Sequence, residues 1–397
     1  MSEPESAIPA LGRGTRGVCA SMSVTNPDGV LPDVAVQSAP LSFFRFLLNG
    51  VIFFAALMIS CFLGSRILPF PEVPVVSDKL AHLARHGDDY DAIFIGSSRV
   101  NFQIIPTVFD RTATDEGLAV RSFNAGVEAM APPEDGYFMD QVLRQPHRRL
   151  RWVFIEIMSM RMKTDPRFGT ARFIYWHDWE RTSLLGKCFL REWLAVPRSR
   201  PKLSVSSAWN YAQAYEVAYD RWGKNLRLFA ENFTNLGRGG ALLDRQMKSP
   251  RVKEAEWHDV EEVGDGWRSP RQDQRMTKDM LAGYMSAYTT LLETPQRFDT
   301  DDEASEEALR RMIAKLKNCG VTPILIIPPT AAPKRFFPTK PTAHSQIVLD
   351  FSDPRKYPEL FTPDHRLDEG HLNVAGSEIF TTALALRFAK LNSAREP

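Results

Sequence analysis

The chain has 397 residues, of which 44% are hydrophobic, and its 49 basic and 48 acidic side chains leave a net charge of +1. This balance provides no overall attraction to nucleic acid, so nucleic-acid binding is not predicted. The four cysteines (Cys19, Cys61, Cys188 and Cys319) lack the spacing of a zinc site, and neither a metal nor a cofactor is predicted. Only Cys188 and Cys319 could pair within a folded domain, and two buried free thiols are the preferred interpretation.

The N-terminal part of the chain changes character sharply near residue 43. Residues 1–42 are rich in Ser, Pro, Ala and Gly without apolar periodicity, which predicts a disordered arm. The stretch that follows, 46–64, is nearly continuous apolar sequence of about the length that spans a bilayer. A single transmembrane helix over residues 43–66 is therefore predicted, with a buried core helix as the alternative. Residues 67–87 begin with a Pro-rich stretch and are predicted to form an extended linker.

Short apolar runs separated by helical patterns follow the linker. The runs predict buried parallel strands over residues 92–95, 152–157 and 324–327, with a weaker strand over 120–123. The sequences PPEDGYFMDQVLRQ and DDEASEEALRRMIAKLKNCG show an acidic first turn and an apolar face, which predict helices. Strands that alternate with helices indicate an α/β domain whose mainly parallel sheet is covered on both faces, a three-layer α/β/α arrangement.

The alternation of strands and helices is interrupted in the middle of the chain. Residues 165–300 are rich in Trp, Tyr and Arg and contain helical stretches such as SSAWNYAQAYEVAYDRW. This segment is predicted to be a large, mostly helical insertion. The α/β domain is accordingly predicted to consist of a first part, residues 88–164, and a second part, residues 301–397.

In a parallel sheet, ligands gather beyond the carboxyl ends of the strands. The first strand ends in Gly96-Ser97-Ser98, and the weaker strand leads into Asn124-Ala125-Gly126. A serine on a tight strand-to-helix turn can provide a nucleophile and one backbone oxyanion donor together. A serine needs a base, and DEGHLN places Asp368 three residues before His371, where the carboxylate can fix the tautomer of the ring.

The order of these motifs resembles that of the SGNH/GDSL hydrolase superfamily. The likeness is greatest to its membrane-anchored, extracytoplasmic members that acylate cell-surface polymers, such as alginate and cellulose acetylation proteins and the D-alanyl-teichoic-acid transfer protein. It covers roughly residues 88–160 and 303–391. It implies a flavodoxin-like domain outside the plasma membrane, held by one helix, and a cell-surface or exported polysaccharide as partner, with a membrane-bound O-acyltransferase as a further partner.

The resemblance also implies roles for individual residues. Ser98 corresponds to the nucleophile, His371 to the base and Asp368 to the residue that orients it. The N–H groups of Ser98 and Gly126 correspond to the oxyanion hole. The asparagine block that the family carries after the next strand is missing, because IEIMSM stands in its place. Without that third donor, hydrolysis is expected to be about two to three orders of magnitude slower.

Several further residues are weaker candidates for substrate contact. Arg99 follows the nucleophile, while Asn124 and Glu156 stand at strand ends. The sequence RFIYWHDWERT gathers aromatic side chains that can stack on sugar rings. Those aromatic candidates are Tyr175, Trp176 and His177. A packed aromatic core of the insertion is the preferred interpretation of this cluster.

The function expected from these features is that of a membrane-anchored serine esterase or O-acyltransferase, with acetyl as the expected acyl group. Transfer of the acyl group to water or to a sugar hydroxyl distinguishes the two activities, and the sequence leaves both open. A non-catalytic accessory that holds a glycan or a partner acyltransferase is the alternative from another class of protein.

Overall fold

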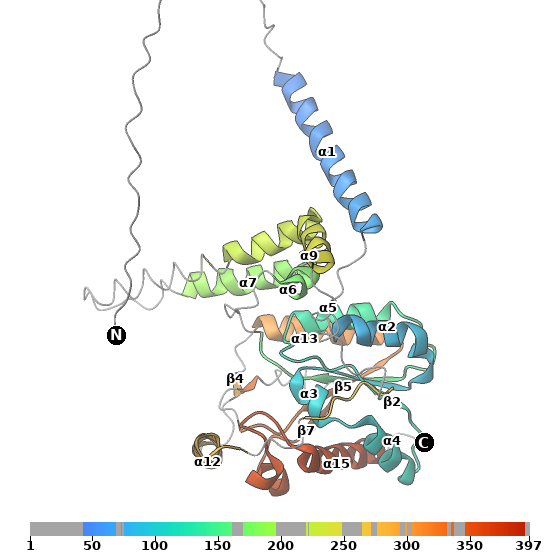
Figure 1. Cartoon of the computed structure of the whole chain (residues 1–397), viewed down its shortest axis with the longest axis vertical. Helices are drawn as coiled ribbons and strands as arrows, with labels where there is room; N and C mark the ends of the chain where they lie inside the picture. Colours follow the sequence, from blue (N-terminus) through green and yellow to red (C-terminus); the bar gives the residue numbers. More distant parts are fainter. Residues whose placement is uncertain are drawn as a thin grey trace, which may run out of the picture. The chain divides into compact units, whose positions relative to one another are not determined.

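The structure is a computed structural model of the whole chain (Figure 1). It describes residues 43–68, 73, 75–160, 170–195, 220, 222–247, 264–270, 276–293, 298–299, 303–331, 335–336 and 346–393. The chain divides into two compact units at Ala56 and Leu57, and the α/β domain belongs to the second unit. The predicted disordered arm, residues 1–42, lies outside the described residues.

The predicted transmembrane segment forms one helix, α1 (Phe43–Ile67). It is long and apolar enough to cross a membrane, and within the described residues it is the single helix that meets this test. Almost all of its side chains are exposed, whereas a core helix would be mostly buried. The exposure argues against the core-helix alternative.

The central element is a five-stranded sheet of parallel strands in the order β2-β1-β3-β5-β7. The strands are β1 (Ala92–Ile95), β2 (Ser122–Asn124), β3 (Trp152–Glu156), β5 (Thr322–Ile327) and β7 (Ile347–Asp350). Four of them lie within a few residues of the predicted runs, while β7 was not predicted. Since β2 and β3 flank β1, the strand order reverses at β1, where ligands bind in open parallel sheets.

Helices cover both faces of the sheet (Figure 1). On one face, α2 (Val76–His86), α5 (Glu134–Leu143) and α13 (Glu303–Asn318) pack on the odd-numbered side chains of β1, such as Ile93 and Ile95. On the other face, α4 (Pro106–Asp115) and α15 (Val374–Ser393) pack on Ala92 and Phe94. This alternation confirms the predicted mainly parallel α/β domain with helices on both faces.

The predicted linker over residues 67–87 was wrong over its second half. Residues 76–86 form α2, and η1 (Gly87–Asp89) leads from it into β1. The apolar side chains of Val76 and Leu83 are buried, because they lie on the face of α2 that packs against the sheet. The helix α2 therefore occupies the part of the predicted linker from Val76 to His86.

The insertion is mostly helical in the part that the structure describes. It contains α6 (Ala171–Trp176), α7 (Trp179–Ala195), a helix over 222–233, α9 (Leu236–Met247) and α12 (Lys278–Glu293). Two short strands, β4 (Phe298–Asp299) and β6 (Arg335–Phe336), pair in parallel. Nearly all of the predicted helix SSAWNYAQAYEVAYDRW lies outside the described residues.

The cysteines of the described segments are free thiols. Cys188 is half-buried and Cys319 is exposed, so the prediction of free thiols holds but the prediction that both are buried was wrong. Cys319 lies in the turn after α13, where the chain is open to solvent.

The aromatic packing on the α15 side of the sheet yields a stability prediction. The Phe154 ring stacks on Phe94 with a centroid distance of 4.6 Å, and it contacts Phe109 and Phe388 edge-on at 5.5 and 5.1 Å. We expect Phe154→Ala to lower the free energy of unfolding by about 3–5 kcal/mol, since it leaves a cavity among these rings. Urea unfolding in detergent measures the loss. Leu386→Ala, at an exposed position of α15, should stay within about 0.5 kcal/mol of the parent.

Candidate active site

Three side chains from two distant parts of the chain meet at the carboxyl end of β1. Ser98 Oγ lies 2.8 Å from His371 Nε2, although 273 residues separate them in sequence. His371 Nδ1 lies 2.9 Å from each carboxylate oxygen of Asp368. With Nδ1–H donating to Asp368, the lone pair of Nε2 faces the serine hydroxyl. This arrangement can accept the Ser98 proton as the hydroxyl attacks an electrophile.

Ser98 owes its position to the turn between β1 and α3 (Ser98–Gln103). Ser97 is the N-cap of α3, and its hydroxyl accepts a hydrogen bond from Arg99 N at 3.2 Å. A Cβ on Gly96 would lie 2.5 Å from Glu156 Oε2 and 2.4 Å from a Val100 methyl, so glycine is required there. The turn therefore presents the second serine, not the first, to the histidine.

Glu156 ends β3 beside this turn and is buried. Its buried carboxylate accepts the Ser97 N–H at 2.6 Å and forms an ion pair with Arg99 Nε at 2.6 Å. The Arg99 contact has the distance of an ion pair without the geometry of a hydrogen bond. Both residues were weak candidates for substrate contact. In the structure the two side chains pair with each other, and Glu156 supports the turn that carries Ser98; its carboxylate provides no hydrogen-bond donor there.

A buried arginine that the sequence did not single out shapes the loop that carries Asp368 and His371. The Arg366 guanidinium donates to the carbonyl oxygens of Glu369 at 2.7 Å and of Pro329 and Leu360 at 3.3 Å. Burial lowers its pKa to about 10. Gln103 Nε2 of α3 donates to Gly370 O at 3.0 Å and joins this loop to the nucleophile helix.

The carboxylate of Asp368 is held in its charged form. Burial opposes ionisation, but the hydrogen bond and charge of His371 outweigh it, together with backbone N–H donors. Those donors are Gly370 N at 2.6 Å and His371 N at 2.8 Å, both to Oδ1. The pKa of Asp368 is consequently lowered from its ordinary value of 3.8. A carboxylate that stays charged can stabilise an imidazolium as it forms on His371.

The structure does not support the predicted oxyanion role of Gly126. Its N–H donates to Asn124 Oδ1 at 2.9 Å and is already used. The Asn124 amide nitrogen donates in turn to the carbonyl oxygens of Val100 and Ile104, each at 2.7 Å. Asn124 is buried and closes the end of α3, so its predicted role in substrate contact was also wrong.

The aromatic cluster of the insertion is a packed core, as the preferred interpretation expected. Tyr175, Trp176 and His177 are all buried, and the Trp176 and His177 rings stack with centroids 3.7 Å apart. Tyr175 Oη donates to Glu134 Oε1 at 3.1 Å, and His177 Nε2 lies 2.8 Å from Asn225 Oδ1. These side chains are not available to a glycan, which corrects their assignment as substrate contacts.

A segment of the insertion, residues 264–270, reaches the site without any sequence signal. Trp267 Nε1 donates to Phe102 O at 2.9 Å, and the Phe102 ring lies edge-on to His371 with centroids 6.0 Å apart. Arg268 N donates to Asn101 O at 3.3 Å, and its guanidinium pairs with Glu128 at 2.6 Å. The insertion thus contacts α3, the helix that begins at Ser98.

Scans of protein-family models, curated proteins and solved structures each found no match to this chain. The assignment of chemistry therefore depends on the geometry of the site itself.

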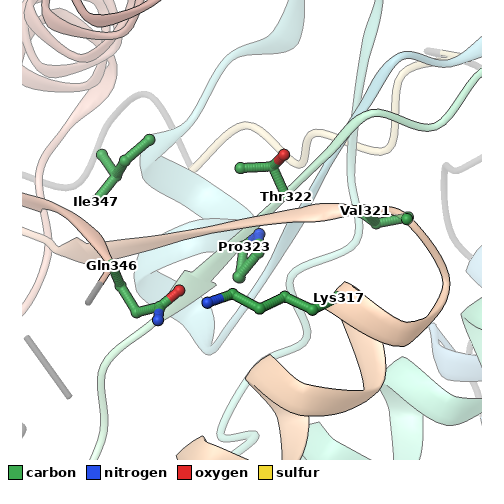
Figure 2. A pocket seen from close by; sticks show the side chains of 7 residues that line it. Lys317, Val321, Thr322, Pro323, Gln346 and Ile347 are labelled. Atoms are coloured by element: carbon green, nitrogen blue, oxygen red, sulfur yellow. The ribbon is translucent and has the colours of Figure 1, made fainter.

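A hollow of about 330 Å³ lies at the opposite end of the sheet from Ser98. Figure 2 shows Lys317 and Gln346 extending toward each other beside Thr322 and Ile347, at the amino ends of β5 and β7. Since Ser98 follows the carboxyl end of β1, this hollow is separate from Ser98, His371 and Asp368. Within the described ranges, no group of His, Cys, Asp and Glu side chains is arranged to hold a metal ion.

Lys79 is a buried cation that the sequence did not single out. It projects from α2, is 1% exposed, and donates to Asn101 Oδ1 at 2.8 Å and to Gly126 O at 2.5 Å. Burial lowers its pKa from 10.5 to about 7, although the Asp265 carboxylate acts in the opposite direction. A neutral amine keeps two N–H donors, which match these two acceptors.

The lowered pKa of Lys79 predicts a pH-dependent stability. Between about pH 7 and pH 10.5 the unfolded chain holds a proton that the folded chain has released. Stability therefore rises with pH across this window, by at most about 1.4 kcal/mol per pH unit. Lys79→Met removes this rise, although it also leaves two acceptors unpaired at every pH. Denaturant unfolding at several pH values measures both slopes.

Lys356→Met, at an exposed position, is the matched control and should keep the slope of the parent chain. Identical slopes for the parent and for Lys79→Met would show that Lys79 does not titrate in this window.

Proposed function

We propose that the chain is an SGNH-like serine esterase or O-acyltransferase, anchored in the plasma membrane by α1 with its α/β domain outside, that acts on acyl esters of a cell-envelope or exported polysaccharide. The observation that carries the proposal is the linear arrangement of Ser98, His371 and Asp368 at 2.8 and 2.9 Å. The strand order β2-β1-β3-β5-β7 supports it, because the sheet strands in chain order read 2-1-3-4-5, the flavodoxin-like order.

The arrangement accounts for acyl transfer in two steps. Ser98 Oγ attacks the acyl carbon while its proton passes to His371 Nε2, and that proton then goes to the departing sugar oxygen as the ester bond breaks. The acyl group remains on Ser98. Water or a sugar hydroxyl next attacks the acyl-serine, again losing its proton to Nε2. Ser98 recovers this proton when the product leaves as an acid or a new ester.

The exposure of the site fits a large substrate. His371 and Asp368 have side chains that are 28% and 41% exposed, so a sugar unit within a polymer can approach them. A buried pocket would admit only a small ester. This accessibility supports a polysaccharide substrate, and it leaves the acyl-serine open to both kinds of acceptor.

The oxyanion hole requires N–H groups that have no other acceptor. Ser98 N, at the start of α3, donates to no other described residue and can face the oxyanion. The N–H groups of Glu128 and Ala129 are likewise without a described acceptor, and Ala129 adopts a strained φ of 56°. We propose that the N–H of Glu128 or of Ala129 replaces that of Gly126 as the second donor to the oxyanion, beside Ser98 N.

One observation favours the alternative of a non-catalytic accessory to a membrane O-acyltransferase. Neither expected side of the oxyanion hole is supplied, since Gly126 N–H is already bonded and Glu156 accepts a hydrogen bond where the family has an asparagine donor. A domain of this kind could bind acylated glycan without turning it over. Turnover is therefore the property that separates the two functions.

Incubation of the full chain in detergent with a chromogenic acetyl ester tests the proposal. We expect release of the chromophore and, after rapid acid quenching, an acetyl group on the peptide that contains Ser98. Addition of an unacetylated polysaccharide distinguishes the activities, since a transferase acetylates it while an esterase releases only acetate. Absence of both chromophore release and acetyl-serine would favour the accessory.

A further inference from the structure

The insertion exposes an unusual run of large apolar side chains. Leu236 and Leu243 are 75% and 63% exposed, and they lie seven residues apart on one face of α9. Trp179, at the start of α7, is 70% exposed and contacts Phe229, which stacks on Phe233 with centroids 5.7 Å apart. The exposed side chains of Trp179, Phe233, Leu236 and Leu243 are called the insertion face below. A soluble surface seldom gathers such residues without a partner.

The start of α9 is joined to the last turns of α1. Asn235 Nδ2 donates to Cys61 O at 2.8 Å, and Arg238 donates to Ser65 O at 3.4 Å. The two helices are also closely packed, because a Cβ on Gly64 would lie 2.8 Å from Asn235 Nδ2. Cys61 is the single buried side chain of α1. The insertion face therefore begins at the end of the segment proposed to cross the membrane.

The depth in the bilayer at which α9 meets α1 follows from the sequence of α1. The apolar run ends at Gly64, and Arg66 follows in the last turn. An arginine that ends an apolar span places its charge among lipid headgroups. With a rise of about 1.5 Å per residue, Cys61 to Ser65 spans about 6 Å, the thickness of one headgroup region. Leu236 starts α9 at that level.

From these contacts we propose that the insertion face rests in the lipid bilayer surface beside α1. The occupant is lipid, because the face is continuous with the end of the membrane-spanning helix and presents Trp, Phe and Leu side chains, which insert at such boundaries. This contact gives the chain a second attachment to the membrane. The inference depends on α1 crossing the membrane and is independent of the acyl-transfer proposal.

Fluorescence quenching in lipid vesicles tests the inference. The full chain carrying Leu236→Cys or Leu243→Cys is labelled with an environment-sensitive dye and incorporated into phosphatidylcholine vesicles. The parent chain, labelled in parallel, gives the background of the four native cysteines. We expect a lipid with a nitroxide near its headgroup to remove most of the dye emission at both positions, and a lipid with a deep nitroxide to remove less.

Two further positions make the result decisive. Arg148→Cys, whose side chain is 91% exposed, should show no quenching by either lipid. Phe54→Cys, near the middle of α1, should be quenched mainly by the deep nitroxide. Emission at Leu236→Cys that is unaffected by both lipids would overturn the inference, whether the dye is open to water or covered by another chain. Absence of deep quenching at Phe54→Cys would overturn it too, by removing the span on which it depends.

Discussion

Replacement of Ser98 by alanine is expected to abolish ester hydrolysis. The alanine variant lacks the hydroxyl oxygen that forms the proposed acyl intermediate, while His371 and Asp368 stay in place. Loss of the nucleophile in an unrelated serine hydrolase lowers kcat by about 10⁶-fold, so a loss of several orders of magnitude is expected here. Release of a chromogenic acetyl ester by the full chain in detergent measures the change.

Two other serines serve as controls for this variant. Ser286→Ala, at an exposed position of α12, should keep the parent rate. Ser97→Ala removes the N-cap of α3 and should lower stability by about 0.5–2 kcal/mol while turnover persists. Equal rates for Ser98→Ala and the parent would refute the assignment of the nucleophile. A rate lost in Ser97→Ala but kept in Ser98→Ala would reverse the roles of the two serines.

The residues that could be predicted from sequence are those whose role follows from type and order along the chain. A serine after a buried strand and an Asp-x-x-His before the last helix are visible without a structure. Their meeting requires only that parallel strands bring their carboxyl ends to one edge. The sheet itself was predictable for the same reason, since β1 and β5 are nearly continuous apolar runs. The strand β7 was missed because its burial is partial and its run is short.

The residues that could not be predicted act through contacts between distant segments. The resemblance predicts Gly126 as an oxyanion donor, but the buried Asn124 side chain accepts its N–H, and the place of that side chain depends on where α3 ends. Arg366 and Lys79 look like surface cations in sequence. In the structure both are buried and donate to oxygen atoms: Arg366 to carbonyls of its own loop and of Pro329 after β5, and Lys79 to the Asn101 amide of α3 and to Gly126 O. No local pattern encodes such partners.

Substitution of Asp368 by asparagine is expected to cost about four orders of magnitude in kcat while leaving the fold intact. Asparagine has the size of aspartate, but its amide nitrogen can donate to His371 Nδ1. The ring would then carry its proton on Nε2, which faces Ser98 and could no longer accept the serine proton. The loss of the carboxylate charge also removes the stabilisation of the imidazolium.

Asp364→Asn, an exposed carboxylate in η4 (Pro363–His365) on the same loop, is the matched control and should keep the parent rate. The comparison measures kcat on the acetyl ester together with the unfolding midpoint, because a misfolded loop would lower both. A variant Asp368→Asn that retains its stability and more than about a tenth of the parent kcat would contradict an orienting role, since a wrong tautomer should be far more costly. Asp368→Glu, which keeps the charge at a longer reach, should recover part of the rate. That recovery would separate the charge from the geometry of the pair.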